Sequence, residues 1–275
     1  MGISERLHGF IVKFLQTYGY LKENFSKEEF LAAIKLFQSV YGMASHGELD
    51  EKTVNAFFYK RCQVPDFLPF RASAYKWNKN KLTYYIKNRD RDLSPEIWDE
   101  AIRKAFHNWT DVANMSFSQV SSSNADIIME IGSGPRDEFD GPSGTLAWAQ
   151  LPPGNNSQLL MKFDVAETWV TNPGNRGILL TNVACHEIGH LLGLEHSRVQ
   201  SALMAPYYSE SISTPQNRDD IPRIQNLYGK PVSNPNPNPT PNPIPSPTPA
   251  PSKTYKLEVT GDLKIEGYRL VKLEN

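Results

Sequence analysis

The segment CHEIGHLLGLEHS holds the side chains of this chain that are most able to do chemistry. His186 and His190 are four residues apart, so on a helix they lie on one face and can reach the same metal ion. Gly193 lets the chain leave the helix and bring His196 back to that ion. Three neutral imidazoles suit Zn²⁺ and leave its fourth position for water, from which Glu187 can take a proton. These residue types at this spacing predict metal-assisted hydrolysis.

The pattern is more specific than a chance cluster of histidines. The extended form H-E-x-x-H-x-x-G-x-x-H lies on a predicted helix and turn, and Met204 follows in the short segment SALMAP. A zinc site followed by such a methionine turn resembles that of the metzincins. The remaining histidines, His8, His46 and His107, have no such surroundings and are expected to be ordinary surface or core residues.

The elements that must position these residues follow from the hydrophobic pattern. Residues 1–60 predict three short amphipathic helices, with Ser26 and Asp50 as capping residues. From residue 82 onward, LTYYIKN, MSFSQV, ADIIMEI and TLAWAQL predict strands, and Ser94 caps a helix that follows the first of them. TNVACHEIGHLL predicts the helix of the first two histidines, and DDIPRIQNLYG predicts the last helix. Residues 132–158, rich in Gly, Pro, Asn and Ser, are expected to be mostly loop.

Composition places the chain among globular proteins. It has 275 residues, 39% hydrophobic and 21% charged, with a net charge of -1. Neither a nucleic-acid-binding surface nor a polybasic membrane anchor is therefore expected, and a monomer is predicted. No apolar run reaches the length of about 18 residues that a transmembrane helix needs. No signal peptide is predicted, because Glu5, Arg6, His8 and Lys13 interrupt any apolar stretch near the start.

Two cysteines, Cys62 and Cys185, are too few for a disulfide framework. A single bridge between them is an alternative, but disulfide geometry is specific and Cys185 adjoins the first histidine in a helix that is predicted to be buried. The thiol of Cys62, in the segment KRCQVPD, therefore needs another explanation.

Over about residues 8–229, the chain resembles a matrixin, or matrix metalloproteinase, in its zymogen form. Ser197 after the third histidine is the matrixin variant of the motif, and DDIPRIQNLYG, YKWNKNKLTYYI and FDGPSGTLAWA resemble the family's closing helix, first strand and metal-binding loop. FQSVYGMASHGELDEKTVNAF resembles its peptidoglycan-binding-like prodomain. The resemblance implies an α+β fold, with a twisted, mostly parallel sheet and three helices after a small three-helix prodomain. It also implies a secreted zinc endopeptidase that acts on polypeptides.

With this resemblance the chain divides into five predicted parts. Residues 1–66 are expected to be the helical prodomain with its cysteine switch, and residues 67–74 the activation segment. Residues 75–229 are expected to be the metzincin catalytic domain. Residues 230–252 form a linker whose alternating prolines favour an extended spacer, and residues 253–275 a short β-like tail of open role.

KRCQVPD resembles the family's switch segment, P-R-C-G-x-P-D. The resemblance implies that Cys62 takes the fourth zinc position in the zymogen, so that no water is activated there. Arg61 and Asp66 would then pair to hold the segment. Lys60 stands where the family has Pro and Gln63 where it has Gly, and the bulk of Gln63 predicts weaker or differently seated latency. The alternative is an ordinary exposed thiol.

Activation in the family requires cleavage after the switch cysteine, which the segment DFLPFRASAY would undergo here. The new amino terminus then pairs with an acidic residue of the last helix. Asp219 and Asp220 match that place in this sequence.

The resemblance implies two further metal sites, a structural zinc and calcium. The structural-zinc positions are Ser133, Pro135, Trp148 and Lys162. None is a credible zinc ligand, so one zinc is predicted, with Trp148 packing in the loop and Lys162 pairing with Asp137 or Glu138. The predicted calcium ligands are the side chains of Asp140, Asp164 and Glu167 and the carbonyls of Gly141, Ser143 and Thr145. Their alternative is a solvated acidic loop.

The resemblance also predicts how a substrate binds. A polypeptide would lie extended against the edge strand that contains Leu146 and Ala147. Val183, Pro206 and Tyr208 would bound an apolar pocket beside it, with Met204 as a floor beneath the metal ligands. Two alternatives are a glycan-binding module, in which the N-terminal helices carry the function, and an intracellular processing protease, which differs only in location.

Overall fold

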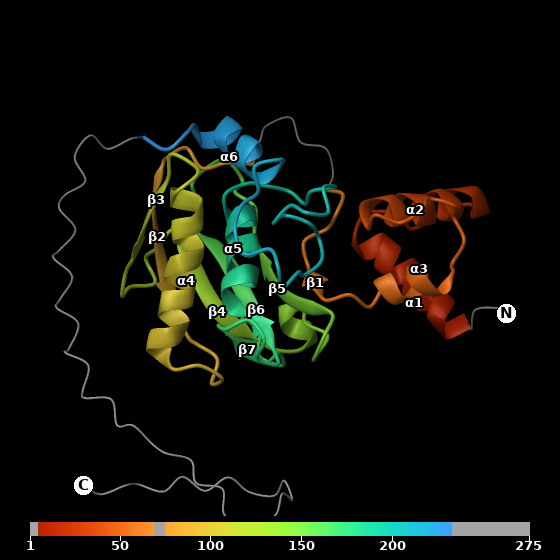
Figure 1. Ribbon diagram of the computed structural model, residues 1–275, viewed down its shortest axis with the longest axis horizontal. Coiled ribbons are helices and arrows are strands. Elements are labelled where there is room, and N and C mark those ends of the chain that lie inside the picture. The colour runs from red at the N-terminus through yellow and green to blue at the C-terminus, as the bar shows by residue number, and fades with distance from the viewer. Residues whose placement is uncertain (1–4, 69–74, 233–275) are drawn as a thin grey trace, which may run out of the picture. The chain divides into compact units, whose positions relative to one another are not determined.

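The computed structural model describes residues 5–68 and 75–232 of the chain (Figure 1). The predicted tail and nearly all of the predicted linker, together with most of the activation segment, lie outside the described residues. Within the described part, no helix is long and apolar enough to cross a membrane.

Three helices form the N-terminal region, by which we mean residues 5–68. They are α1 (Glu5–Thr17), α2 (Lys27–Val40) and α3 (Glu51–Ala56). Ser26 and Glu29 exchange side-chain and backbone hydrogen bonds at the start of α2, a capping box that confirms Ser26 as the predicted capping residue. The apolar faces of the helices bury one cluster, with Ile11, Leu15 and Phe37 at its centre.

The second region, residues 75–232, is built on a sheet to which the N-terminal region adds one strand, and the strand order is β1-β5-β6-β4-β2-β3. The strand from the N-terminal region is β1 (Arg61–Cys62). The others are β2 (Lys81–Ile86), β3 (Ser116–Gln119), β4 (Ile127–Gly132), β5 (Thr145–Ala149) and β6 (Leu159–Asp164). All neighbouring strands are parallel except β5 and β6. A separate pair consists of β7 (Trp169–Val170) and β8 (Ile178–Leu179).

The sequence pattern does not predict two strands of the sheet, β6 and β1. β6 lies between β5 and β4, yet its segment LLMKFD follows a loop-forming stretch and includes the charged Lys162. β1 has only two residues and comes from the N-terminal region, so it exists through its pairing with β5 and no local pattern can predict it. These two strands complete the part of the sheet beside the histidine segment.

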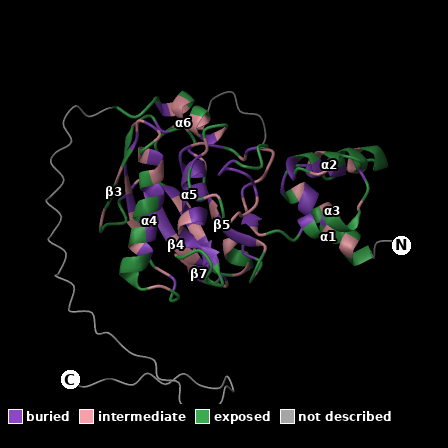
Figure 2. Cartoon of the chain, in the orientation of Figure 1, coloured by how far each residue is buried: buried purple, intermediate pink, exposed green. Residues whose placement is uncertain are grey.

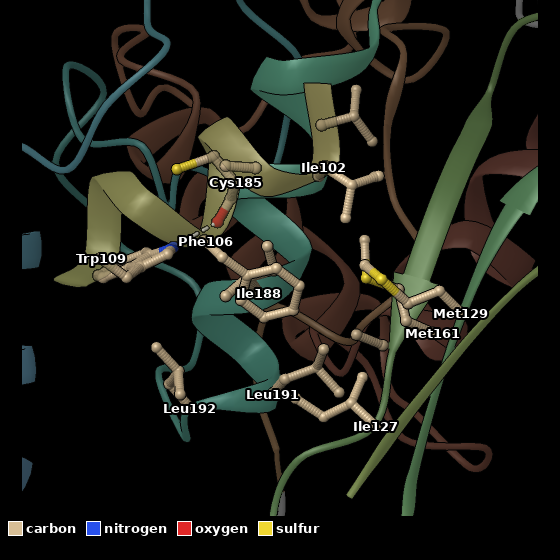
Figure 3. Packing of buried hydrophobic residues seen from close by; sticks show 14 of the residues in the cluster. Ile102, Phe106, Trp109, Ile127, Met129, Met161, Cys185, Ile188, Leu191 and Leu192 are labelled. Atoms are coloured by element: carbon tan, nitrogen blue, oxygen red, sulfur yellow. Dashed lines mark hydrogen bonds between the residues drawn. The ribbon is translucent and has the colours of Figure 1, made fainter. Parts of the chain in front are cut away.

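Helices α4 (Pro95–Thr110) and α5 (Leu180–Leu191) lie side by side along the sheet (Figure 1). Figure 3 shows Phe106 of α4 and Ile188 of α5 together in the core, with Met161 of the sheet nearby. The indole N–H of Trp109 donates to the carbonyl oxygen of Cys185 at 2.8 Å. Almost the whole of α5 is buried (Figure 2), so the helix that carries His186 and His190 is held on all sides.

The last helix, α6 (Asp220–Tyr228), ends at Gly229 as predicted. With α4 and α5 it makes up the three helices expected in this part of the chain. The predicted fold class, α+β with a mostly parallel sheet after N-terminal helices, is confirmed.

Candidate metal centre

Four side chains that can ligate a metal converge at the end of α5. The ligand atoms of Cys62, His186, His190 and His196 all lie within 4.8 Å of one another. The Nε2 atom of His190 is 3.1 Å from that of His186 and 3.2 Å from that of His196. Tetrahedral zinc with ordinary bond lengths separates its ligand atoms by about 3.3–3.7 Å, so the four residues fit this ion. Among the described residues no other group meets at one point in this way.

In His186 and His190, the hydrogen bond made by Nδ1 determines which ring nitrogen faces the centre. Nδ1 of His186 lies 2.7 Å from the carbonyl oxygen of Leu203, and Nδ1 of His190 lies 2.7 Å from that of Leu194. A carbonyl accepts only from an N–H, so each Nδ1 carries the proton and each Nε2 keeps its lone pair for a metal. Burial lowers the pKa of His186 to about 3 and holds that of His190 well below its usual range, so both rings are neutral.

The position of the third histidine, His196, depends on the turn that follows α5. Gly193 has φ of 98°, and a Cβ there would lie 1.8 Å from the carbonyl oxygen of Tyr75. Glycine is therefore required at this turn, as the spacing predicts. Nδ1 of His196 lies 2.9 Å from Asp66 Oδ1, a contact that does not meet hydrogen-bond geometry. Asp66 thus connects the N-terminal region to this ring.

Glu187 is buried beside the four ligands. Burial raises the pKa of its carboxyl to about 8, and the neighbouring Cys62 thiol opposes this shift. Its Oε2 atom has no hydrogen-bond partner among the described residues. A metal ion at the histidines would lower the pKa again, because a nearby cation favours the carboxylate. A buried carboxyl with a free oxygen next to a metal group is a candidate general base.

Met204 packs beneath the site helix. A Cβ on Gly189 would lie 2.3 Å from the sulfur of Met204, so only glycine allows this approach. Asp220 holds the segment from the other side, since its carboxylate accepts from the backbone N–H groups of Leu203, Met204 and Gln216. The predicted methionine turn is therefore fixed by α6.

Replacing Asp220 by alanine is expected to lower the free energy of unfolding by about 3 kcal/mol or more, because three buried N–H groups lose their acceptor. Urea unfolding followed by tryptophan fluorescence measures the change. Asp219→Ala is the matched control. Within the described part of the chain, the Asp219 carboxylate pairs with Arg223 alone, near the surface, so its loss is expected to cost less than about 1 kcal/mol. Equal losses in the two variants would contradict this role for Asp220.

Cys62 is held in the centre by the segment around it. β1 runs parallel to β5, with Cys62 opposite Ala147. The buried guanidinium of Arg61 pairs with Asp66, donates to the carbonyl oxygen of Cys62 and to the hydroxyl of Tyr41, and stacks on the ring of Tyr18. Burial opposes ionisation of Asp66, but Arg61 and His196 hold its pKa at about 2. Cys62 and Cys185 are both free and buried, so neither a bridge nor an exposed thiol describes them.

Gln63 is accommodated without disturbing this segment. Its Oε1 accepts from the hydroxyl of Tyr18 at 2.9 Å and from that of Thr145 at 2.7 Å, while its N–H donates to Ala147. The side chain thus connects the residue that follows α1 to β5. The geometry gives no support to the expectation that its bulk weakens the seating of the segment.

Lys162 forms ion pairs that link the loop containing the structural-zinc positions to the sheet. Its ammonium lies 2.6 Å from Asp137 and 3.0 Å from Glu130, and the indole N–H of Trp148 donates to the carbonyl oxygen of Asp137. The predicted pairing with Asp137 is confirmed, whereas the second partner is Glu130 and not Glu138. Glu130 lies on β4 directly opposite Lys162, a position the sequence cannot indicate before β6 is known.

The three predicted calcium carboxylates lie near one another. Asp164 is fully buried, and its Oδ2 has no partner among the described residues. Burial, reinforced by Asp140, raises the pKa of Asp164, and burial likewise raises that of Glu167. Backbone N–H groups of Thr145 and Ser143 donate to Asp140 and Glu167. A divalent cation would satisfy the free oxygen of Asp164, so the donor set fits calcium although the atoms are not as compact as in the histidine group.

A small cavity of about 30 Å³ opens beside His186 and Glu187. Its lining includes the predicted residues Leu146, Val183, Pro206 and Tyr208, together with Asn182 and Ile212, which the sequence pattern does not indicate. Asn182 is buried and donates to the carbonyl oxygens of Ser209 and Glu210, so it holds one wall. Ala147 lies outside this lining, and its carbonyl oxygen accepts from Gln63. The predicted substrate edge of β5 therefore carries the segment around Cys62.

Comparison with known proteins agrees with this geometry. The matrixin peptidase family model matches residues 76–229, which is more than half of the chain. The chain belongs to the matrixin family. His8, His46 and His107 are exposed in this matrixin, as expected for residues outside the centre.

Relatives of this matrixin include a collagenase, a hatching enzyme and a stromelysin. Interstitial collagenase from Bos taurus is 38% identical over 237 residues, which cover 82% of this chain and 50% of the collagenase. Hatching enzyme from Paracentrotus lividus is 38% identical over 225 residues, covering 78% of this chain and 38% of that enzyme. Stromelysin-1 from Mus musculus is 36% identical over 240 residues, covering 81% and 49%. The chain spans half or less of the length of these relatives.

Proposed function

We propose that this matrixin is a zinc-dependent endopeptidase whose zymogen is held latent by Cys62. The convergence of the Cys62 thiol with three neutral imidazoles is the observation that carries the proposal. Zinc held by His186, His190 and His196 would polarise a peptide carbonyl and lower the pKa of a water molecule. The proposal is tested by hydrolysis of a casein or gelatin substrate after removal of the N-terminal region, with and without a chelator.

Glu187 acts as the general base in this proposal. Its free Oε2 atom and its place in the lining of the cavity support the assignment. The carboxylate takes a proton from the attacking water and passes it to the leaving amine. Proton transfer of this kind requires a fixed geometry, and the burial of α5 provides it.

The substrate is an extended polypeptide that replaces the segment around Cys62 on β5. Pairing of β1 with β5 supports this site, because it marks the strand edge that a polypeptide can use. The side chain that follows the cleaved bond enters the cavity between Leu146, Val183 and Tyr208, so small or medium apolar residues are preferred. Met204 packs below the ligands and takes no part in the chemistry.

Latency follows from the place of Cys62. A thiolate at the fourth zinc position excludes water, and the Arg61–Asp66 pair holds the segment there. Cleavage within residues 67–74 frees a new amino terminus that binds the last helix. Asp219 is the better partner for it, because both oxygens of Asp220 already accept backbone hydrogen bonds. Family membership further implies an extracellular protease.

The proposal also includes the metal content of the protein, which is one zinc ion per chain together with calcium. Lys162 occupies the place of a structural-zinc ligand with an ammonium that two carboxylates already neutralise, so this loop needs no metal. We expect about one zinc per chain by plasma mass spectrometry of the purified protein, and none in the His190→Ala variant. Two zinc ions per chain would contradict the one-zinc proposal.

A further inference from the structure

Lys60, which departs from the family's switch pattern, lies next to the carboxylate cluster of Asp140, Asp164 and Glu167. Its Nζ atom is 3.8 Å from Oε2 of Glu167, whose side chain is only 4% exposed. Among the described residues, Lys60 is the one basic side chain at ion-pair distance from these three acids. The N-terminal region therefore supplies a cation to the cluster.

The loop that follows Asp140 has two further contacts with the residues on either side of Cys62. The N–H of Arg61 donates to the carbonyl oxygen of Gly144 at 2.8 Å, and the hydroxyl of Thr145 donates to Gln63. Thr145 is itself expected to ligate calcium through its carbonyl, and Gly144 lies between it and Ser143, another expected ligand. A rearrangement of this loop on cation binding would therefore change its hydrogen bonds with Arg61 of β1 and with Gln63.

Charge decides the sign of the coupling. Asp164 and Glu167 are buried while Asp140 is exposed beside them, and Oδ2 of Asp164 has no partner among the described residues. An ammonium at Glu167 offsets part of this negative charge, and a divalent cation that binds the cluster would offset more of it. The two positive charges compete for the same carboxylate and repel each other at this distance.

We propose that calcium binding at this cluster and docking of the segment around Cys62 oppose each other through Lys60, which makes calcium a signal for opening the zymogen. The inference rests on the proposed calcium site and cysteine switch. Linkage requires that calcium loosens the docked segment by the same factor by which docking weakens calcium.

Calcium titration calorimetry on the full chain tests this inference. The Glu187→Ala background prevents self-cleavage, and Lys60→Met removes the charge while keeping an unbranched apolar side chain. We expect Lys60→Met to bind calcium about three- to fivefold more tightly, the size of one partly exposed ion pair. Lys79→Met is the matched control, because Lys79 pairs with Asp126 and is expected to leave calcium affinity unchanged.

The rate of Cys62 alkylation, followed by mass spectrometry, gives a second readout that does not need activity. Calcium is expected to speed the alkylation of Cys62 in the chain that keeps Lys60. In the Lys60→Met chain, calcium is expected to have little effect on this rate. Equal calcium affinity in both chains would overturn the coupling while leaving the calcium site in place. If neither chain binds calcium, both the site and the coupling are wrong.

Discussion

Replacing Glu187 by alanine is expected to reduce peptide hydrolysis by about a thousandfold or more, while zinc stays bound. The expected loss follows from the proton transfers that a general base supplies, which are worth about 10²–10⁴-fold. Alanine removes the carboxylate but leaves the three imidazoles and their carbonyl partners in place. Hydrolysis of a quenched fluorescent peptide by the processed protein, together with its zinc content, measures both effects.

Glu195→Ala is the control for this experiment. Glu195 is an exposed carboxylate in the same turn, next to His196, so its loss tests whether any change of charge near the site has the same effect. We expect nearly full activity from this variant. Substantial turnover by Glu187→Ala with zinc bound would rule out Glu187 as the base.

Replacing Cys62 by serine is expected to give an unprocessed chain that hydrolyses peptides or cleaves itself. Serine has nearly the same size, but its neutral hydroxyl is a much weaker zinc ligand than a thiolate, so water can reach the metal. The buried Arg61–Asp66 pair is left intact and still holds the segment, so activity below that of the processed protein is expected. Peptide hydrolysis and intact-mass analysis of the freshly purified chain measure the result.

The double variant Cys62→Ser with Glu187→Ala separates self-cleavage from contamination. It is expected to stay intact and inactive, because the proposed base is missing. A silent Cys62→Ser chain that contains its zinc would refute latency through this thiol. Cleavage of the double variant would point instead to another protease in the preparation.

Local sequence patterns predict much of this fold, because the features concerned are local in origin. Ser26, Asp50 and Ser94 cap their helices as expected, since a cap depends only on the next three residues. The helix of His186 and His190 and the turn at Gly193 likewise follow from spacing and from the conformational freedom of glycine. β6 was not predictable in this way, because the partners on both of its sides determine it.

By itself, the sequence determined which residues can form a zinc site and which family the chain resembles, because these conclusions need only residue types, spacing and motifs. The resemblance in turn predicts that four positions of a second zinc site lack ligands. The tertiary structure decided that Cys62 lies among the three histidines, that Gln63 joins Tyr18 to β5, and that Lys162 pairs with Glu130. Each of these contacts joins residues that are distant in the chain, and their distances depend on strand register and packing, which no local pattern contains.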